Sequence, residues 1–144
     1  MVSFKEIDRD NFFDVIKLDV AEDQKSFVAT NLFSIAQAKA FPECIALAIY
    51  DDNVLVGFMM YCIDMEDHEY WIYRLMIDAK YQSKGYGKAA MEKLIDIIKE
   101  DKEHHVLYLS FEPNNTLAKH LYETLGFKAD GRVIEGEIVY KLKY

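Results

Sequence analysis

The segment between residues 70 and 100 constrains the fold more than any other part of the chain. Tyr70–Ile77 is rich in aromatic and aliphatic residues, as expected of a buried strand. Lys80–Gly87 follows as a loop with two glycines. The next residues place apolar side chains at helical spacing: Ala90, Met91, Leu94, Ile95, Ile97 and Ile98. Because an amphipathic helix must bury its apolar side, this segment predicts helices packed on a sheet.

The remaining patterns extend this prediction to the whole chain. Strands are expected at Val2–Glu6, Cys44–Tyr50, Val54–Ile63, Val106–Phe111, Phe127–Ile134 and Glu137–Tyr144. Helices are expected at Asn11–Asp19 with Asp10 as its N-cap, at Ser26–Phe41, at Lys88–Glu100 and at Asn114–Leu125, the last ended by Gly126. This order predicts an α+β (mixed α/β) fold on a central sheet. The length of 144 residues predicts a single domain over residues 1–144.

Charge is distributed unevenly along the chain. The 17 basic and 25 acidic residues give a formal net charge of −8, which argues against a protein that binds nucleic acid by neutralising phosphates. Between Ala40 and Tyr73 there is no lysine or arginine, but there are seven acids: Glu43, Asp51, Asp52, Asp64, Glu66, Asp67 and Glu69. This acidic quarter is either a set of solvated loops or a surface that attracts a cationic partner.

The cysteines and histidines give no sign of disulfide bonds or of a metal site. Cys44 and Cys62 lie in apolar runs without metal-ligand spacing, which favours buried free thiols in a reducing compartment. The N-terminal residues have no apolar segment typical of a secretion signal, and no apolar run is long enough to span a bilayer. We therefore expect a cytoplasmic protein without membrane contact. The histidines are isolated or, like His104 and His105, adjacent, so no metal site is expected.

The loop before the long helix has the features of an anion site. Gly85 and Gly87 remove side chains where the chain must turn tightly, and they let a ligand approach the backbone. Free N–H groups at the helix start attract anions, and Lys80, Lys84 and Lys88 surround the turn. Neither the P-loop motif nor the dinucleotide-binding motif is present. Taken alone, the loop predicts either a phosphate-bearing ligand or a structural turn.

Two motifs give this loop a more specific meaning. Gln82, Gly85 and Gly87 form Gln-x-x-Gly-x-Gly after the aliphatic strand. A second motif follows further along the chain and consists of Asn114, Asn115, Ala118, Tyr122, Gly126 and Phe127. Together they resemble the GCN5-related N-acetyltransferase (GNAT) superfamily, firmly over residues 43–142. The resemblance implies a mostly antiparallel twisted sheet, splayed at its middle and flanked by about four helices. It also implies acetyl-CoA-dependent transfer of an acetyl group to an amine.

Two shorter phrases resemble bacterial polyamine acetyltransferases, which act on spermine, spermidine or diamines. They are residues 18–29 and Trp71–Asp78. This resemblance implies a small polyamine as the acceptor. Two alternatives stay open: an acetyltransferase for a protein or peptide amine or an aminoglycoside, and a regulatory module that binds CoA without turnover. Tyr122 argues against the module, which would have no need of it.

The resemblance also implies which residues bind acetyl-CoA. The strand residues Leu75, Met76 and Ile77 would offer backbone groups to the pantetheine arm, as an added strand does. The backbone amides of the loop would hold the pyrophosphate, and Gln82 would also bind the cofactor. The amides are those of Ser83, Lys84, Gly85, Tyr86, Gly87 and Lys88. Asn115, at the start of the next helix, would contact the pantetheine arm.

Tyr122 occupies the position of the family's general acid. A phenol of pKa about 10 can protonate a departing thiolate of pKa about 8.5; an ordinary helix-face aromatic is the alternative. Some relatives carry a glutamate base where this chain has Tyr73. Strand alternation places Glu69, Trp71, Tyr73 and Leu75 on one face, so we expect Glu69 to act as the base through water. The alternatives are a solvated strand end and proton loss through ordered water.

The expected acceptor site is acidic and aromatic. Glu22 and Asp23, with the Asp64–Glu69 cluster, would form a mouth for an extended polycation, and salt would weaken its binding. Trp71 and Tyr73 would contact its methylene groups or its charges, although core packing is the commoner role of such aromatics. The expected partner is thus a small-molecule amine. A homodimer is also expected, because relatives often pair through sheet edges.

Overall fold

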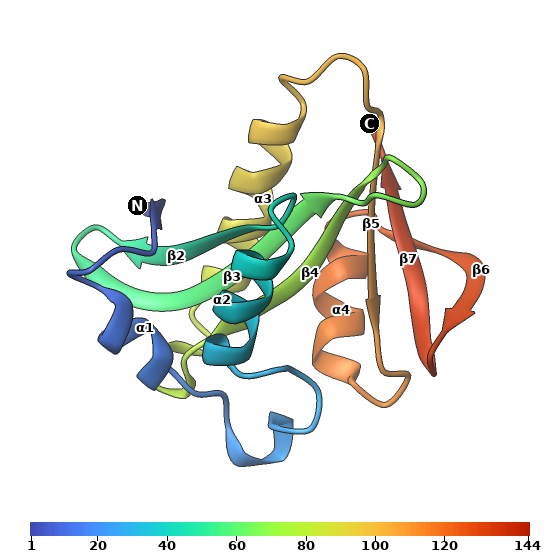
Figure 1. Cartoon of the computed structure of the whole chain (residues 1–144). Helices are drawn as coiled ribbons and strands as arrows, with labels where there is room; N and C mark the ends of the chain where they lie inside the picture. Colours follow the sequence, from blue (N-terminus) through green and yellow to red (C-terminus); the bar gives the residue numbers. More distant parts are fainter.

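The computed structural model describes residues 1–144 (Figure 1). Its strands are β1 (Val2–Glu6), β2 (Ile45–Asp51), β3 (Val54–Ile63), β4 (Tyr70–Ile77), β5 (Val106–Phe111), β6 (Lys128–Ile134) and β7 (Glu137–Lys143). Its helices are α1 (Phe12–Lys17), α2 (Asn31–Ala40), α3 (Tyr86–Ile98) and α4 (Thr116–Thr124), with 3-10 turns at Glu22–Gln24 and Ala79–Tyr81. The predicted fold class and element order are confirmed.

The seven strands form one sheet in the order β1-β2-β3-β4-β5-β7-β6. Every neighbouring pair is antiparallel except β4 and β5, which are parallel. Figure 1 shows α1 and α2 in front of the sheet and α3 behind it. The sheet therefore has a helical layer on each face, as a two-sided core requires.

Each face of the sheet has its own hydrophobic core. Leu94, Ile98 and the neighbouring buried residues of α3 pack with Tyr122 of α4 on one face. Val15 of α1 packs with Cys62 and the other buried residues of the α1/α2 face. Both cysteines are buried and free, as predicted. Ile97 departs from the predicted apolar stripe because its side chain lies on the exposed side of α3.

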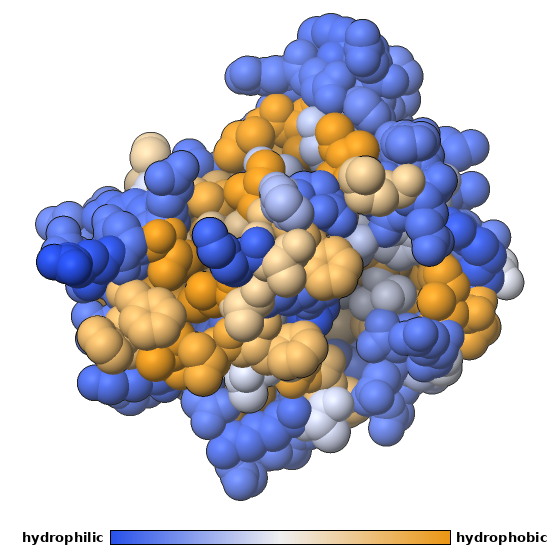
Figure 2. Space-filling view, in the orientation of Figure 1, coloured by the Kyte–Doolittle hydropathy of each residue, from blue (hydrophilic) through white to orange (hydrophobic).

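The outer face of α1 and α2 carries apolar side chains in contact with solvent. Phe13, Leu32 and Phe33 are each more than half exposed, and Figure 2 shows apolar side chains gathered over this front face. No helix of the structure is both long and apolar enough to cross a membrane.

The N-terminal helices begin later than predicted. Asn11, not Asp10, is the N-cap residue of α1. The Asn11 side chain is buried, where it accepts from the Asp8 amide and donates to the Glu6 carbonyl. The N-cap of α2 is Thr30, whose hydroxyl accepts from the Phe33 amide at 3.1 Å. Residues 26–29 therefore remain outside the helix and are free to line a cavity.

A β-bulge interrupts β4 at its centre. Met60 pairs with Arg74, whereas the next residue, Tyr61, pairs with Ile72. Tyr73 is therefore an extra residue without a partner in β3, and the strand bends there.

The bulge changes which side chains share a face. Trp71 and Tyr73 pack on the α1/α2 face, whereas Leu75 packs on the α3/α4 face. The prediction that Trp71, Tyr73 and Leu75 point the same way is wrong, because the extra residue shifts the alternation by one.

Strands β4 and β5 separate halfway along their length. Their parallel pairing covers only Tyr70–Ile72 against Leu107–Leu109. Beyond it, β4 continues to Ile77 beside β3, while β5 continues to Phe111 beside β7. The predicted splay is confirmed, and it leaves a gap in the middle of the sheet.

His104 makes hydrogen bonds at the end of the sheet where β4 and β5 are still paired. Its Nδ1 lies 2.7 Å from Asp101 Oδ2, and its Nε2 lies 3.0 Å from the His68 carbonyl oxygen. Both ring nitrogens thus face acceptors, and only the protonated ring can donate to both. Partial burial opposes the charge, but these two acceptors outweigh it and raise the pKa of His104. The imidazolium ties the α3–β5 loop to the β3–β4 turn.

This contact predicts a pH-dependent stability. Because the pKa is higher in the folded chain than in the unfolded one, the stabilisation is complete below about pH 6.5 and disappears as pH rises through the folded-state pKa. We expect His104→Ala to lower the free energy of unfolding more at about pH 5.5 than at about pH 9, measured by urea denaturation. His105→Ala, at an exposed neighbouring position, is the control. An equal loss at both pH values would contradict a charged His104.

Candidate active site

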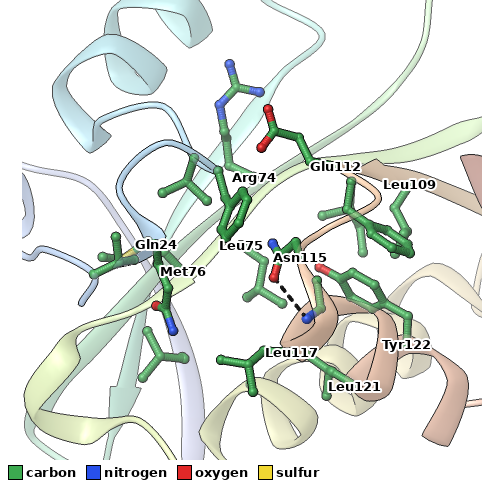
Figure 3. A pocket seen from close by; sticks show the side chains of 18 of the residues that line it. Gln24, Arg74, Leu75, Met76, Leu109, Glu112, Asn115, Leu117, Leu121 and Tyr122 are labelled. Atoms are coloured by element: carbon green, nitrogen blue, oxygen red, sulfur yellow. Dashed lines mark hydrogen bonds between the residues drawn. The ribbon is translucent and has the colours of Figure 1, made fainter. Parts of the chain in front are cut away.

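A cavity of about 750 Å³ occupies the gap between β4 and β5 (Figure 3). The residues before α2, the second half of β4, the glycine loop with the start of α3, the end of β5, α4 and the β6–β7 turn all contribute to its wall. Since α1/α2 and α3/α4 lie on opposite faces of the sheet, the cavity is reached by groups from both faces.

The backbone of β4 presents hydrogen-bonding groups to the cavity. The Asp78 amide donates to the Val56 carbonyl at 2.8 Å. In this antiparallel register, the peptide groups of Leu75 and Ile77 point away from β3 and into the gap. The Ile77 carbonyl accepts there from Gln82 Nε2 at 3.0 Å. The predicted strand residues Leu75, Met76 and Ile77 all line the cavity.

The glycine loop supplies a row of backbone donors. Gly85, the N-cap of α3, has φ +86°, a conformation that favours glycine. The first amide of this region with a backbone partner is that of Ala89, which donates to the Gly85 carbonyl. The N–H groups of Ser83–Lys88 are therefore available to a ligand.

The predicted loop residues line the cavity with one exception. They are Gln82, Ser83, Gly85, Tyr86, Gly87 and Lys88. Lys84 does not line it, and its ammonium lies 5.9 Å from the centre of the Tyr81 ring. Gly87 has ordinary helical backbone, and an added Cβ there would make only a normal contact with Leu121. Gly85 is thus the glycine that the turn requires.

Helix α4 places Asn115 and Tyr122 in the wall. The Asn115 carboxamide oxygen caps the helix by accepting from the Ala118 amide at 3.2 Å. Tyr122 lies two turns later and is 8% exposed, between Phe111 and Phe127. Burial raises the pKa of Tyr122 to about 12. Figure 3 shows its hydroxyl pointing toward the centre of the cavity.

Arg74 lines the cavity from the α1/α2 face. Its guanidinium donates to the Tyr73 carbonyl at 2.8 Å and to the Gln37 side chain of α2 at 3.0 Å. Its Nε is buried without a hydrogen-bond partner. Arg74 therefore joins α2 to the β4 bulge and keeps a positive charge beside the cavity.

Three carboxylates that the sequence analysis missed line the same cavity: Glu112, Glu135 and Glu137. Glu112 follows β5, and Glu135 and Glu137 flank Gly136 in the β6–β7 turn. The Ser110 hydroxyl donates to Glu137 Oε1 at 2.7 Å. Glu112 stands just before the Asn114-Asn115 motif and could have been noticed for that reason. Glu137 reaches the site only because β7 lies beside β5, which no local pattern reveals.

None of the acids predicted to form a mouth, Glu22, Asp23 and the Asp64–Glu69 cluster, lines the cavity. Glu22 instead pairs with Lys25 at 2.7 Å. The neighbouring Gln24 does line the cavity, and it accepts a hydrogen bond from Gln82 at 2.7 Å. The loop thus contributes an amide to the cavity where carboxylates were expected.

The predicted acceptor-site aromatics, Trp71 and Tyr73, and the predicted general base, Glu69, do not lie together. Tyr73 lines the cavity, but its hydroxyl donates to Asp64, and burial together with this contact raises the pKa of Tyr73. Trp71 lies outside the cavity and stacks on Tyr108. Glu69 also lies outside, immediately before β4 at the end of the strand remote from the gap.

Comparison with known proteins agrees with the geometry of the cavity. Residues 3–127 match the model of the acetyltransferase (GNAT) family. Spermine/spermidine N(1)-acetyltransferase of Bacillus subtilis is 30% identical over 138 residues, covering 92% of this chain and 91% of that protein. Ribosomal protein bS18-alanine N-acetyltransferase of Escherichia coli is 38% identical over 56 residues, covering 39% of this chain and 37% of that protein.

A solved structure extends the likeness to three dimensions. Spermidine N-acetyltransferase from Vibrio cholerae, in complex with CoA and spermine, superposes with a TM-score of 0.77 at 17% identity. The match covers 99% of this chain and 95% of that one. The superposition confirms the fold. The family match and the Bacillus relative establish that the chain belongs to the GNAT family and is an acetyl-CoA-dependent N-acetyltransferase.

Proposed function

We propose that this enzyme acetylates a primary amine of a small polyamine of the spermidine or spermine type. The proposal rests on three carboxylates that line the cavity: Glu112, Glu135 and Glu137. They would attract an acceptor with several positive charges. The Bacillus relative, named for spermine and spermidine, supports the same acceptor.

The α3/α4 side of the cavity fits acetyl-CoA, which supplies the acetyl group as an activated thioester. The free amides of Ser83–Lys88, at the start of α3, suit the pyrophosphate. Lys88 adds a positive charge. The peptide groups of Leu75 and Ile77 suit the amides of the pantetheine arm, as in strand addition. Asn115 lines the same cavity and would contact this arm.

Tyr122 is proposed as the general acid. Its hydroxyl remains protonated throughout the physiological pH range, because burial raises its pKa to about 12. It can therefore donate a proton to the departing thiolate. The N–H groups of Leu75 and Ile77 would stabilise negative charge on the carbonyl oxygen. The enzyme needs no covalent intermediate, since holding the two substrates together removes much of the barrier.

The acceptor would enter from the α1/α2 side. Phe27 and Val28, from the segment before α2, line the same cavity and would offer apolar surface to methylene groups. Arg74 would disfavour a second ammonium close to the reacting one. A peptide amine is the second candidate, because the bS18-alanine acetyltransferase shares a 56-residue segment with the chain. The cytoplasmic location and the homodimer remain predictions.

The acceptor proposal predicts the outcome of an amine panel. Purified enzyme with acetyl-CoA should release free thiol in the presence of spermidine or spermine, and raised salt should increase KM because the carboxylates are screened. Glu112→Gln should raise KM for spermidine several-fold and leave kcat nearly unchanged. Turnover of peptides without turnover of polyamines would refute the polyamine acceptor.

Removing the Tyr122 hydroxyl tests its proposed role as the general acid. Tyr122→Phe keeps the ring in its aromatic cluster, so the fold and CoA affinity should persist while kcat falls about 10²-fold. Tyr140→Phe is the matched control, because that hydroxyl binds Glu123 and lies outside the cavity. If CoA affinity collapsed with kcat, Tyr122 would be a binding contact and not the acid.

The glycine loop makes a separate prediction. Gly85→Val forces a β-branched residue into left-handed backbone, so the amide row should move and CoA affinity should fall at least about tenfold. Gly131→Val, at φ +96° in β6, imposes similar strain away from the cavity and should not affect CoA binding. Isothermal titration with CoA measures both. Equal losses would show that the effect of Gly85 is global instability.

A further inference from the structure

We propose that Glu137, held by Ser110, is the general base that takes the proton from the acceptor ammonium. The inference rests on the proposed entry of the amine from the α1/α2 side, but it does not depend on that amine being a polyamine. A base is needed because a primary amine of pKa about 10 is almost wholly protonated at neutral pH, and its ammonium cannot attack a carbonyl.

Glu69, the base expected from the sequence, lies outside the cavity. Three other titratable groups on the α1/α2 face are also unsuited to this role. Tyr73, at the strand position where some relatives have a glutamate, already donates its proton to Asp64. Cys44 and Cys62 are buried in the α1/α2 core, and burial raises both thiol pKa values. The base must therefore come from another element.

The topology places Glu137 at the point where the sheet opens. The last β4–β5 pair is Ile72 with Leu109, so Ser110 is the first β5 residue beyond it. Ser110 pairs with Val139 of β7, and Val139 lies in the core of the α1/α2 face. Glu137, two residues before Val139, shares that face. Its hydrogen bond to Ser110 confirms this orientation.

The carboxylate is oriented but not neutralised. The Ser110 hydroxyl donates to Oε1, which leaves Oε2 available to an ammonium. No lysine or arginine forms an ion pair with Glu137. Arg74 lies near enough for attraction between the two charges, although its own hydrogen bonds go to Tyr73 and Gln37. The other charged groups on this side are Glu112 and Glu135.

Acid and base then lie on opposite faces of the sheet. Tyr122 belongs to the α3/α4 core, and Glu137 lies on the α1/α2 face. Two protons leave the ammonium nitrogen during acetyl transfer. The first passes to Glu137 and then to water, which frees the lone pair that forms the C–N bond. The C–S bond breaks with its electrons on sulfur, and the thiolate is protonated by Tyr122. The second proton from nitrogen restores the Tyr122 phenol.

Glu137→Gln tests this assignment, because glutamine can still accept the Ser110 hydrogen bond. At about pH 7 the variant should lose about a hundredfold or more in kcat/KM, with CoA affinity and thermal stability unchanged. It can use only amine that is already neutral, so its rate should rise about tenfold per pH unit toward the amine pKa. The deficit should therefore shrink below about tenfold near pH 9.5.

Two controls make the outcome specific. Glu135→Gln removes an exposed carboxylate of the same cavity, so it should raise KM for the amine but keep the wild-type pH dependence of kcat. The assays use whichever amine the wild-type enzyme acetylates fastest, so failure of the polyamine assignment leaves this test intact. A deficit of the same size at every pH, or a change in KM alone, would overturn the assignment and make Glu137 a binding residue. Wild-type activity in Glu137→Gln would also overturn it.

Discussion

The separation of β4 from β5 is the constraint on which the rest of the site depends. The β4–β5 pairing ends after three residue pairs. The bulge bends β4 away from β5, while β5 stays hydrogen-bonded to β7. Arg74 anchors the bulge to α2 through Gln37. Without the separation, the peptide groups of Leu75 and Ile77 would be used within the sheet, and no passage would join its two faces.

The two faces of the gap differ in charge. Free amides of the glycine loop and Lys88 favour anionic phosphates on the α3/α4 side. On the other side Glu137 favours a cation. Glu112 and Glu135 add negative charge to the same cavity, and Arg74 adds one positive charge. Acids of the acidic quarter make structural contacts outside the cavity instead. Asp51 binds the N-terminal ammonium and the Tyr86 hydroxyl, and Asp67 accepts from the Trp71 indole.

The sequence predicted most of the fold because its strong signals are local. The strands Tyr70–Ile77 and Val106–Phe111 have the predicted limits, and α4 ends before Gly126 as expected. The glycine loop was found for the same reason, since its residues are contiguous. The cavity also contains Tyr122 and Asn115, which lie within one motif.

What could not be predicted depends on contacts between distant segments. The bulge at Tyr73 exists only in the register with β3, and it invalidated the face assignment on which the choice of Glu69 depended. Glu137 approaches Ser110 across 27 residues, through the β5–β7 pairing. The acidic composition between Ala40 and Tyr73 was visible, but composition does not show which carboxylates face a cavity.

A crystal structure of the enzyme with CoA and spermidine would locate the sulfur and the reacting amine together. We expect the sulfur in the gap beside Leu75, within hydrogen-bond reach of the Tyr122 hydroxyl. We expect a primary amine within reach of Glu137 on the opposite face. An amine bound at the Asp64–Glu69 turn, or on the same face as Tyr122, would contradict this arrangement.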